Sequence, residues 1–175
     1  MTPLIGPRLT LRPVEPTDLD CLYIWENDES NWRVGITTAP LSHYCIDQYV
    51  RTTKADIYAE RQLRLIIALA DNSEAVGTID LCDYNPHDSR AQMGIFIAPK
   101  YRRRGYARQA LALLDRYVCE TLHIHQLWAL AATDNTPSQA LLRSCGYSAA
   151  GRLHQWLRRP DHTFADVDFL QRLFT

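Results

Sequence analysis

Apolar and polar positions alternate along several short segments of the chain, as they do in half-buried β-strands. Residues 8–14 alternate in this way, and the segments 63–70, 75–83 and 92–98 are apolar and end at turn-forming residues. Pro99 follows the last of these segments and cannot donate a hydrogen bond to a sheet. Because the links between the three segments are short and rich in turn residues, we expect an antiparallel meander.

A repeat of apolar residues every three or four positions predicts helices elsewhere. The clearest helix covers 105–120, and others are expected from Pro16 to Glu26, over 42–53, and over 136–145. Thr136 is the expected cap of the last helix, and Gly146 its left-handed C-terminal residue. Strands are expected over 126–132, 147–157 and 163–169. The order β-α-α-β-β-β-α-β-α-β-β predicts one α/β (α+β) domain spanning residues 1–175, a mixed sheet with helices on its faces.

Composition and charge narrow the functional classes. The 175 residues are 46% hydrophobic, and 19 basic against 20 acidic side chains give a net charge of −1, which argues against a nucleic-acid partner. The longest aliphatic stretch, 65–70, is far too short to cross a bilayer, and no signal peptide is visible at the N-terminus. Five widely spaced cysteines and scattered histidines show no metal-ligand spacing. We therefore expect a cytoplasmic protein without a metal or a membrane partner.

The junction over residues 95–108 carries the clearest chemistry. A strand ends there, a basic loop containing Gly105 follows, and the best helix begins. The first turn of a helix has N–H groups without intrahelical partners, and its dipole attracts anions. The glycine lets a phosphate approach the backbone, and four arginines add charge: Arg102, Arg103, Arg104 and Arg108. The alternative is a solvated basic cluster, whereas Rossmann and P-loop motifs are absent.

Three motifs in this chain resemble those of one family. Arg102-x-x-Gly105-x-Ala107 after Ile97-Ala98-Pro99 resembles the coenzyme A signature of the GNAT N-acetyltransferases. Asn135-x-x-Ser138, with Leu141-Leu142 and Gly146-Tyr147, resembles the block after their fifth strand. Gly151-Arg152-Leu153, Asp161 and Asp166-Val167 resemble the tail of the spermidine and ribosomal-protein branches. The resemblance implies a mostly antiparallel sheet of about seven strands flanked by about four helices.

The resemblance also implies a donor and the residues that bind it. The donor would be acetyl-CoA, with Ile95 and Ile97 offering main-chain groups to the pantetheine arm. Asn135 and Ser138 would contact coenzyme A near the thioester; the alternatives are a loop turn for Asn135 and a first-turn donor for Ser138. The pyrophosphate would be bound, mostly through N–H groups, by Arg102, Arg103, Arg104, Gly105, Tyr106 and Ala107.

Acetyl transfer to an amine needs a neutral nitrogen and a leaving thiol. An alkylammonium titrates near pH 10.4, so a base, desolvation, or both must remove its proton. Asp80 is the candidate base, with a solvated carboxylate as the alternative. Many family members have a Tyr, the usual candidate acid for the thiolate, where this chain has Leu142, which leaves no assigned proton donor. Ser138, Ser144 or water are the candidates for that role. The spermidine branch commonly has a Glu where this chain has Gln92, so a carboxylate base on that strand is missing as well.

The acceptor is expected near the first helix and the loop after it. This segment combines carboxylates with indoles, which suits a cationic amine, although core tryptophans and solvated acids are the alternative. The candidate residues are Trp25, Glu26, Asp28, Glu29 and Trp32. Three hypotheses remain open: acetylation of a small amine, with polyamines and diamines favoured; acetylation of a protein N-terminus; and a non-catalytic coenzyme A sensor. The resemblance also suggests a homo-oligomer.

Overall fold

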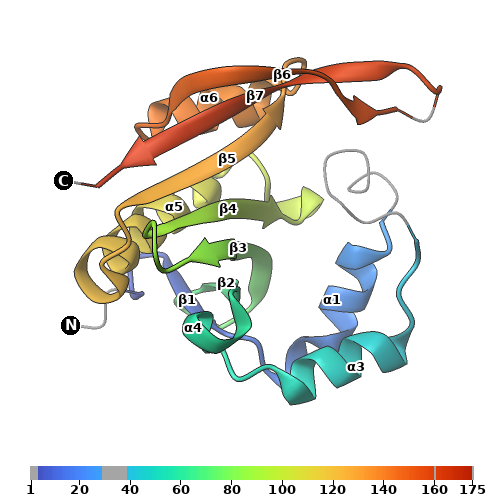
Figure 1. Ribbon diagram of the computed structural model, residues 1–175. Helices are drawn as coiled ribbons and strands as arrows, with labels where there is room; N and C mark the ends of the chain where they lie inside the picture. The colour runs from blue at the N-terminus through green and yellow to red at the C-terminus, as the bar shows by residue number, and fades with distance from the viewer. Residues whose placement is uncertain (1–3, 29–38, 160, 175) are drawn as a thin grey trace.

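A computed structural model describes residues 4–28, 39–159 and 161–174 of the chain. Its centre is a seven-stranded sheet in the order β1-β2-β3-β4-β5-β7-β6 (Figure 1). The strands are β1 (Leu9–Pro13), β2 (Leu63–Leu69), β3 (Ala75–Asn85), β4 (Arg90–Ile97), β5 (Gln126–Ala132), β6 (Ser148–Arg158) and β7 (Phe164–Leu173). The predicted fold class and the seven predicted strands are therefore confirmed.

Strand pairing confirms the meander and adds one parallel contact. β2, β3 and β4 pair antiparallel in sequence order, and β1 pairs antiparallel with β2. β5 and β7 pair antiparallel, as do β6 and β7. Among the described strands only β4 and β5 pair in parallel, because α5 connects them as a crossover. This single parallel junction positions the site described below.

The helices follow the predictions, with three differences. The described α-helices are α1 (Leu19–Glu26), α3 (His43–Thr52), α4 (Ile57–Glu60), α5 (Tyr106–Tyr117) and α6 (Thr136–Ser144). A 3-10 turn, Pro16–Asp18, precedes α1, and a π-helical turn, Val118–Leu122, extends α5. The short helix α4 was not predicted, because four residues are too few to show a helical period.

The expectation that Thr136 caps α6 is wrong. The cap is Asn135, whose side-chain oxygen accepts a hydrogen bond from the Ser138 N–H at 3.2 Å. Asn and Thr are both favoured caps, and the sequence offered them side by side. The predicted end of the helix is confirmed, since Gly146 follows it with φ of +85°.

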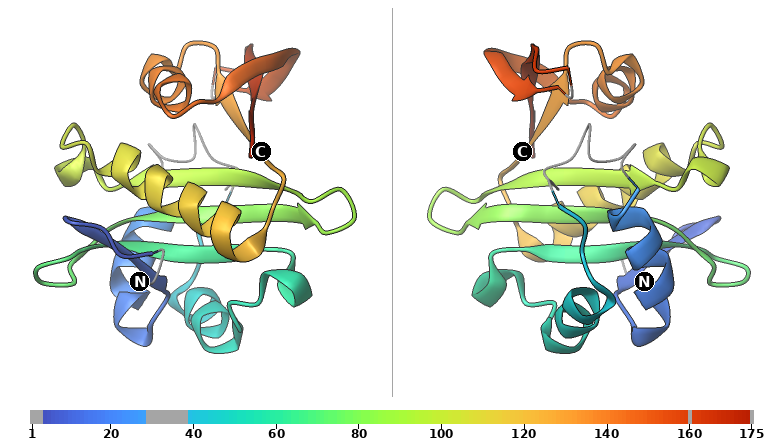
Figure 2. Two further views of the ribbon diagram at one scale, coloured as in Figure 1. Left: turned by 90° about the vertical axis from the view of Figure 1, so that its left-hand side faces the viewer. Right: turned by 90° about the vertical axis from the view of Figure 1, so that its right-hand side faces the viewer.

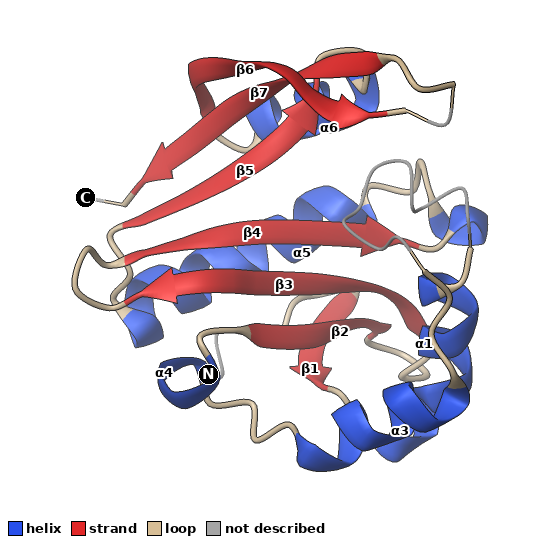
Figure 3. Ribbon diagram, turned by 45° about the vertical axis from the view of Figure 1, so that its right-hand side comes forward, coloured by secondary structure: helices blue, strands red, loops and turns tan. Residues whose placement is uncertain are grey.

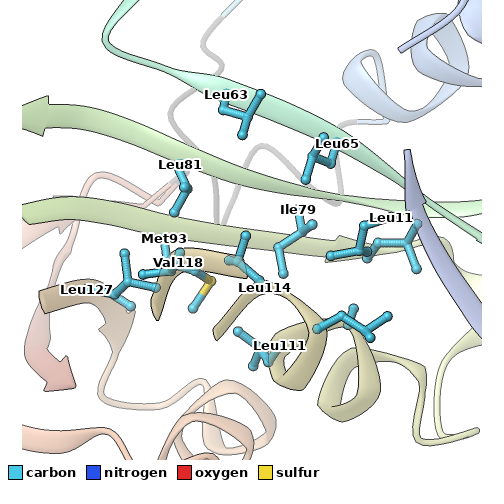
Figure 4. Packing of buried hydrophobic residues seen from close by; sticks show 14 of the residues in the cluster. Leu11, Leu63, Leu65, Ile79, Leu81, Met93, Leu111, Leu114, Val118 and Leu127 are labelled. Carbon is cyan, nitrogen blue, oxygen red and sulfur yellow. The ribbon is translucent and has the colours of Figure 1, made fainter. Parts of the chain in front are cut away.

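The main core lies between the sheet and α5 (Figure 4). Leu63 and Leu65 on β2 point to this face together with Ile79 on β3, and Leu111 and Leu114 cover them from the apolar side of α5. All five side chains are at most 5% exposed. Because side chains alternate along a strand, the intervening residues of the same strands face the opposite side of the sheet.

That opposite face is covered by α1 and α3, as the two side views show (Figure 2). Leu22 on α1 and Ile46 on α3 form a second cluster with Ile66 and Ala68 of β2. This cluster is smaller than the first and covers only the β2 end of the sheet. Over β3 and β4 the same face carries polar residues instead, and these belong to the candidate site.

Candidate functional site

The two parallel strands at the centre of the sheet separate soon after they meet. β4 and β5 pair over only three positions, from Arg90 opposite Gln126 to Gln92 opposite Trp128. Beyond these pairs the strands diverge toward their carboxyl ends (Figure 3). Helices α5 and α6 follow β4 and β5 directly, so both helix N-termini lie at this end of the sheet. Ligands of sheets with parallel strands commonly bind at such carboxyl ends.

The edge of β4 that faces the divergence carries the main-chain groups of Ile95 and Ile97. Main-chain groups of successive strand residues point to opposite edges. The Ala98 N–H bonds to Val76 of β3 at 2.9 Å, so even-numbered residues of β4 direct their polar groups toward β3. Odd-numbered residues direct theirs toward the divergence, which is where the sequence placed the pantetheine contacts. The Ile97 carbonyl already accepts a hydrogen bond from Nε of Arg102 at 2.9 Å.

The loop between β4 and α5 concentrates main-chain donors. From Arg103 to Arg108, six successive N–H groups donate no hydrogen bond to any other described residue, and the first N–H of the helix with a partner is that of Gln109. Gly105 is the N-cap of α5 with φ of +79°, and no side chain caps this helix. Arg103 is also left-handed, with φ of +62°. Uncapped donors at a helix N-terminus suit an anion.

The arginine side chains of the loop serve partly as structural supports. Arg102 Nε holds the Ile97 carbonyl, and the Arg102 guanidinium lies 5.9 Å from the ring centre of Phe96. The Arg104 guanidinium lies 5.7 Å from the Tyr101 ring, while Arg103 is exposed. The Tyr106 side chain is buried, so this residue offers an anion only its N–H. Main-chain groups therefore supply most of the directed donors.

The N-terminus of α6 lies at the end of β5 and is already capped. Asn135 fills the capping role, and the half-buried Ser138 donates its N–H to that cap. Leu142 is 4% exposed and belongs to the main core, where it packs as an apolar side chain. The Ser144 hydroxyl donates to the Leu141 carbonyl at 2.8 Å, at the far end of the helix. Of the two serines considered as proton donors, Ser138 is therefore the better placed.

Asp80 lies on β3, on the face that α1 and α3 partly cover. Arg64 of β2 donates Nε to its Oδ1 at 2.7 Å and also binds Glu26 of α1 at 2.7 Å. The Asp80 side chain is 16% exposed. Burial raises the pKa of this carboxyl, and the positive charge of Arg64 opposes the rise. Asp80 is thus held in a fixed position in an ion-pair network whose formal charge is −1.

Of the other predicted acceptor residues, the structure describes three and leaves two outside the described ranges. The Trp25 and Phe96 rings lie 5.5 Å apart at 52°, so this indole borders the face of β4. Glu26 is engaged with Arg64, and Asp28 ends the first described segment of the chain. Glu29 and Trp32 lie outside the described residues.

Two residues of this region were missed by sequence reasoning. Arg64 interrupts the aliphatic strand β2, and a charge in such a run is itself a signal of a buried partner. Gly94 sits in the middle of β4 directly opposite Asp80. An isolated glycine in a strand often marks a close approach of a ligand or backbone, which was the available signal.

No helix within residues 4–28, 39–159 and 161–174 is long and apolar enough to span a bilayer. Across these same ranges, no three His, Cys, Asp or Glu side chains gather closely enough to hold a metal ion.

Comparisons with known proteins agree with this geometry. The family model described as "Acetyltransferase (GNAT) domain" matches residues 8–148. An uncharacterized N-acetyltransferase, YoaA, of Bacillus subtilis is 27% identical over 86% of this chain and 85% of its own length. Spermidine N(1)-acetyltransferase of Escherichia coli K12 is 26% identical over 82% of this chain and 74% of its own. The crystal structure of spermidine N-acetyltransferase from Vibrio cholerae in complex with CoA and spermine has a TM-score of 0.83 at 23% identity and covers 96% of both chains.

Proposed function

Because the chain belongs to the GNAT family of acetyl-CoA-dependent acetyltransferases, we propose that its acceptor is a primary amine, with small polyamines and diamines favoured. Two relatives named above support this class of acceptor, since one is a spermidine acetyltransferase and the other was crystallised with spermine. The acids on α1 and β3 also support it, because their network carries a net negative charge beside aromatic rings.

One observation carries the donor side of this function: the run of six N–H groups from Arg103 to Arg108 that have no acceptor among the described residues. Such groups at a helix N-terminus are satisfied by water or by a ligand, and a diphosphate supplies enough oxygens to accept from several of them. The residues present therefore fit the pyrophosphate of coenzyme A. Ile95 and Ile97, on the diverging edge of β4, are the candidates to hold the pantetheine arm in the same ligand.

Acetyl-CoA supplies an activated acetyl group, and the residues of this chain have to prepare the amine. At pH 7 only about one alkylammonium in several thousand has lost its proton. We assign Asp80 to accept that proton, directly or through a water. Its pKa is raised toward neutral pH, and a base works best when its pKa is near the working pH. The N–H groups on the diverging edge of β4 near Ile97 would stabilise the oxyanion that forms as the nitrogen attacks.

The leaving thiol needs less help than the amine, because its pKa is near 8.5. With Leu142 buried in the core, no tyrosine stands at that position to protonate it. We assign Ser138, in the first turn of α6, to donate a hydrogen bond to the departing sulfur. This assignment requires that the Ser138 hydroxyl, and not only its N–H, faces the end of β5.

The test measures release of free thiol from acetyl-CoA in the presence of spermidine, spermine, putrescine, n-butylamine and a short peptide. Turnover with the polyamines and diamines supports the proposal, and turnover with the peptide alone would show a protein N-terminal acetyltransferase instead. Calorimetry with coenzyme A is run in parallel. Binding without turnover on any acceptor would identify a coenzyme A sensor, and absence of binding would overturn the assignment of the loop. Light scattering on the same sample tests our further proposal of a homo-oligomer.

A further inference from the structure

Gly94 lies in the middle of β4, where its backbone does not require a glycine. Among the described glycines, only Gly105 and Gly146 have a positive φ. A glycine inside a strand costs stability, because it has more freedom in the unfolded chain and no side chain to pack. Its presence in the strand next to the candidate acceptor face therefore calls for a reason other than backbone geometry.

Steric contacts with the neighbouring strand also do not require it. On β3, a Cβ built at Gly77 would overlap the Phe96 carbonyl oxygen, so that position needs a glycine. A Cβ built at Gly94 would lie 3.8 Å from Cβ of Asp80 and 3.9 Å from its Oδ2, which are ordinary contact distances. Apart from Gly94 itself and its two chain neighbours, no other described residue has an atom within 4 Å of it. The missing side chain thus leaves a space beside Gly94, and among the described residues it is the Asp80 side chain that borders this space.

The surroundings of this space suit an amine. Gln92 and Phe96 share the face with Gly94, because they are two residues away on the same strand, and Trp25 contacts Phe96 from α1. Arg64 engages Oδ1 of Asp80 at 2.7 Å but reaches Oδ2 only at 3.4 Å. The oxygen nearest the space is therefore the one that the ion pair satisfies least, and it keeps capacity to accept another hydrogen bond.

We propose that Gly94 determines acceptor specificity: its missing side chain opens a subsite in which the amino group of an unbranched primary amine reaches Oδ2 of Asp80. The nitrogen donates a hydrogen bond to that oxygen, and the alkyl stem lies against the aromatic rings of Phe96 and Trp25. This inference rests on the proposed amine acetylation and identifies the part of the site that selects the amine. Ile95, beside Gly94, begins the edge assigned to the donor, so the subsite adjoins the place of transfer.

The test is the variant Gly94→Ala, with Gly151→Ala as the matched control. Gly151 is also in a strand, has no atom within 4 Å of its built Cβ, and lies on the edge strand β6. We expect Gly94→Ala to lower kcat/KM for spermidine and n-butylamine about tenfold or more, as added methyl groups do in filled pockets. The KM for acetyl-CoA should stay within about twofold of wild type. The melting temperature should not fall, because alanine fits the strand.

A double-mutant cycle with Asp80→Asn assigns the effect to the subsite. Calorimetric binding of spermidine to the coenzyme A complex is measured for wild type, both single variants and the double variant. If Gly94 acts by admitting the amine to Asp80, the penalty of the added methyl shrinks in the Asp80→Asn background. Additive effects, or an unchanged kcat/KM in Gly94→Ala, would overturn the inference. A wild-type protein that binds spermidine but acetylates none of the amines would refute the proposed function alone, while failure to bind any amine would refute both.

Discussion

Gly105 is the position where the proposed donor site can be perturbed most selectively. It caps α5 with φ of +79°, in the middle of the six free N–H groups. A left-handed L-residue costs about 1–2 kcal/mol, and alanine recovers about 0.5–1 kcal/mol by restricting the unfolded chain. The nearest described atom to a Cβ built there is Nε2 of Gln109 at 4.0 Å, so no clash adds to this cost. Gly105→Ala should therefore destabilise the fold by only about 1 kcal/mol.

The effect on coenzyme A binding should be larger. Relief of the strain turns the peptide planes whose N–H groups converge on the anion, and one charge-assisted hydrogen bond is worth about 1.5–3 kcal/mol. Loss of a single bond therefore predicts binding about tenfold to a hundredfold weaker by calorimetry. Gly146→Ala is the control. Gly146 also has a positive φ, of +85°, but it follows the C-terminus of α6 and not the N-terminus of a helix. Equal affinities in the two variants would refute the assignment of this loop.

Three further predictions concern charged and polar groups. Arg64→Met should shift the acid limb of the pH–rate profile to higher pH, because loss of the cation raises the pKa of Asp80 further; an unshifted limb would remove Asp80 as the base. The Asp115 carboxyl, bonded to Arg172 at 2.8 Å, has its pKa raised by burial to about 6. It therefore stabilises the fold most when protonated, and wild type should lose about 1.4 kcal/mol relative to Asp115→Asn between pH 5 and 7.5 in urea unfolding. A parallel pH dependence in both would contradict this. Ser138→Ala should lower kcat about tenfold with little change in the coenzyme A dissociation constant, and an unchanged kcat would leave the thiol to water.

The central part of the sheet shows which features a local sequence pattern can predict. Leu63, Leu65 and Ile79 were assignable to a buried strand from their own segments, and the α5 face of the core confirms them. The basic loop and Gly105 were likewise readable, because an anion-binding helix N-terminus is built from consecutive residues. The cap of α6 was misplaced by one residue, since Asn135 and Thr136 have similar capping preferences.

The amino-acid sequence by itself determined the order of the strands along the chain, the family motifs and the position of the basic loop proposed to bind the donor, because each depends on local periodicity and on neighbouring residues. Only the tertiary structure decided that Arg64 neutralises one of the two carboxylates of Asp80 and Glu26. It also decided that Gly94 on β4 lies opposite Asp80 on the neighbouring strand β3. The neighbouring pairs Gly94–Asp80, Arg64–Asp80 and Arg64–Glu26 are 14, 16 and 38 positions apart in the chain. Strand register and helix docking bring them together, and both arise from burial of side chains elsewhere in the sheet.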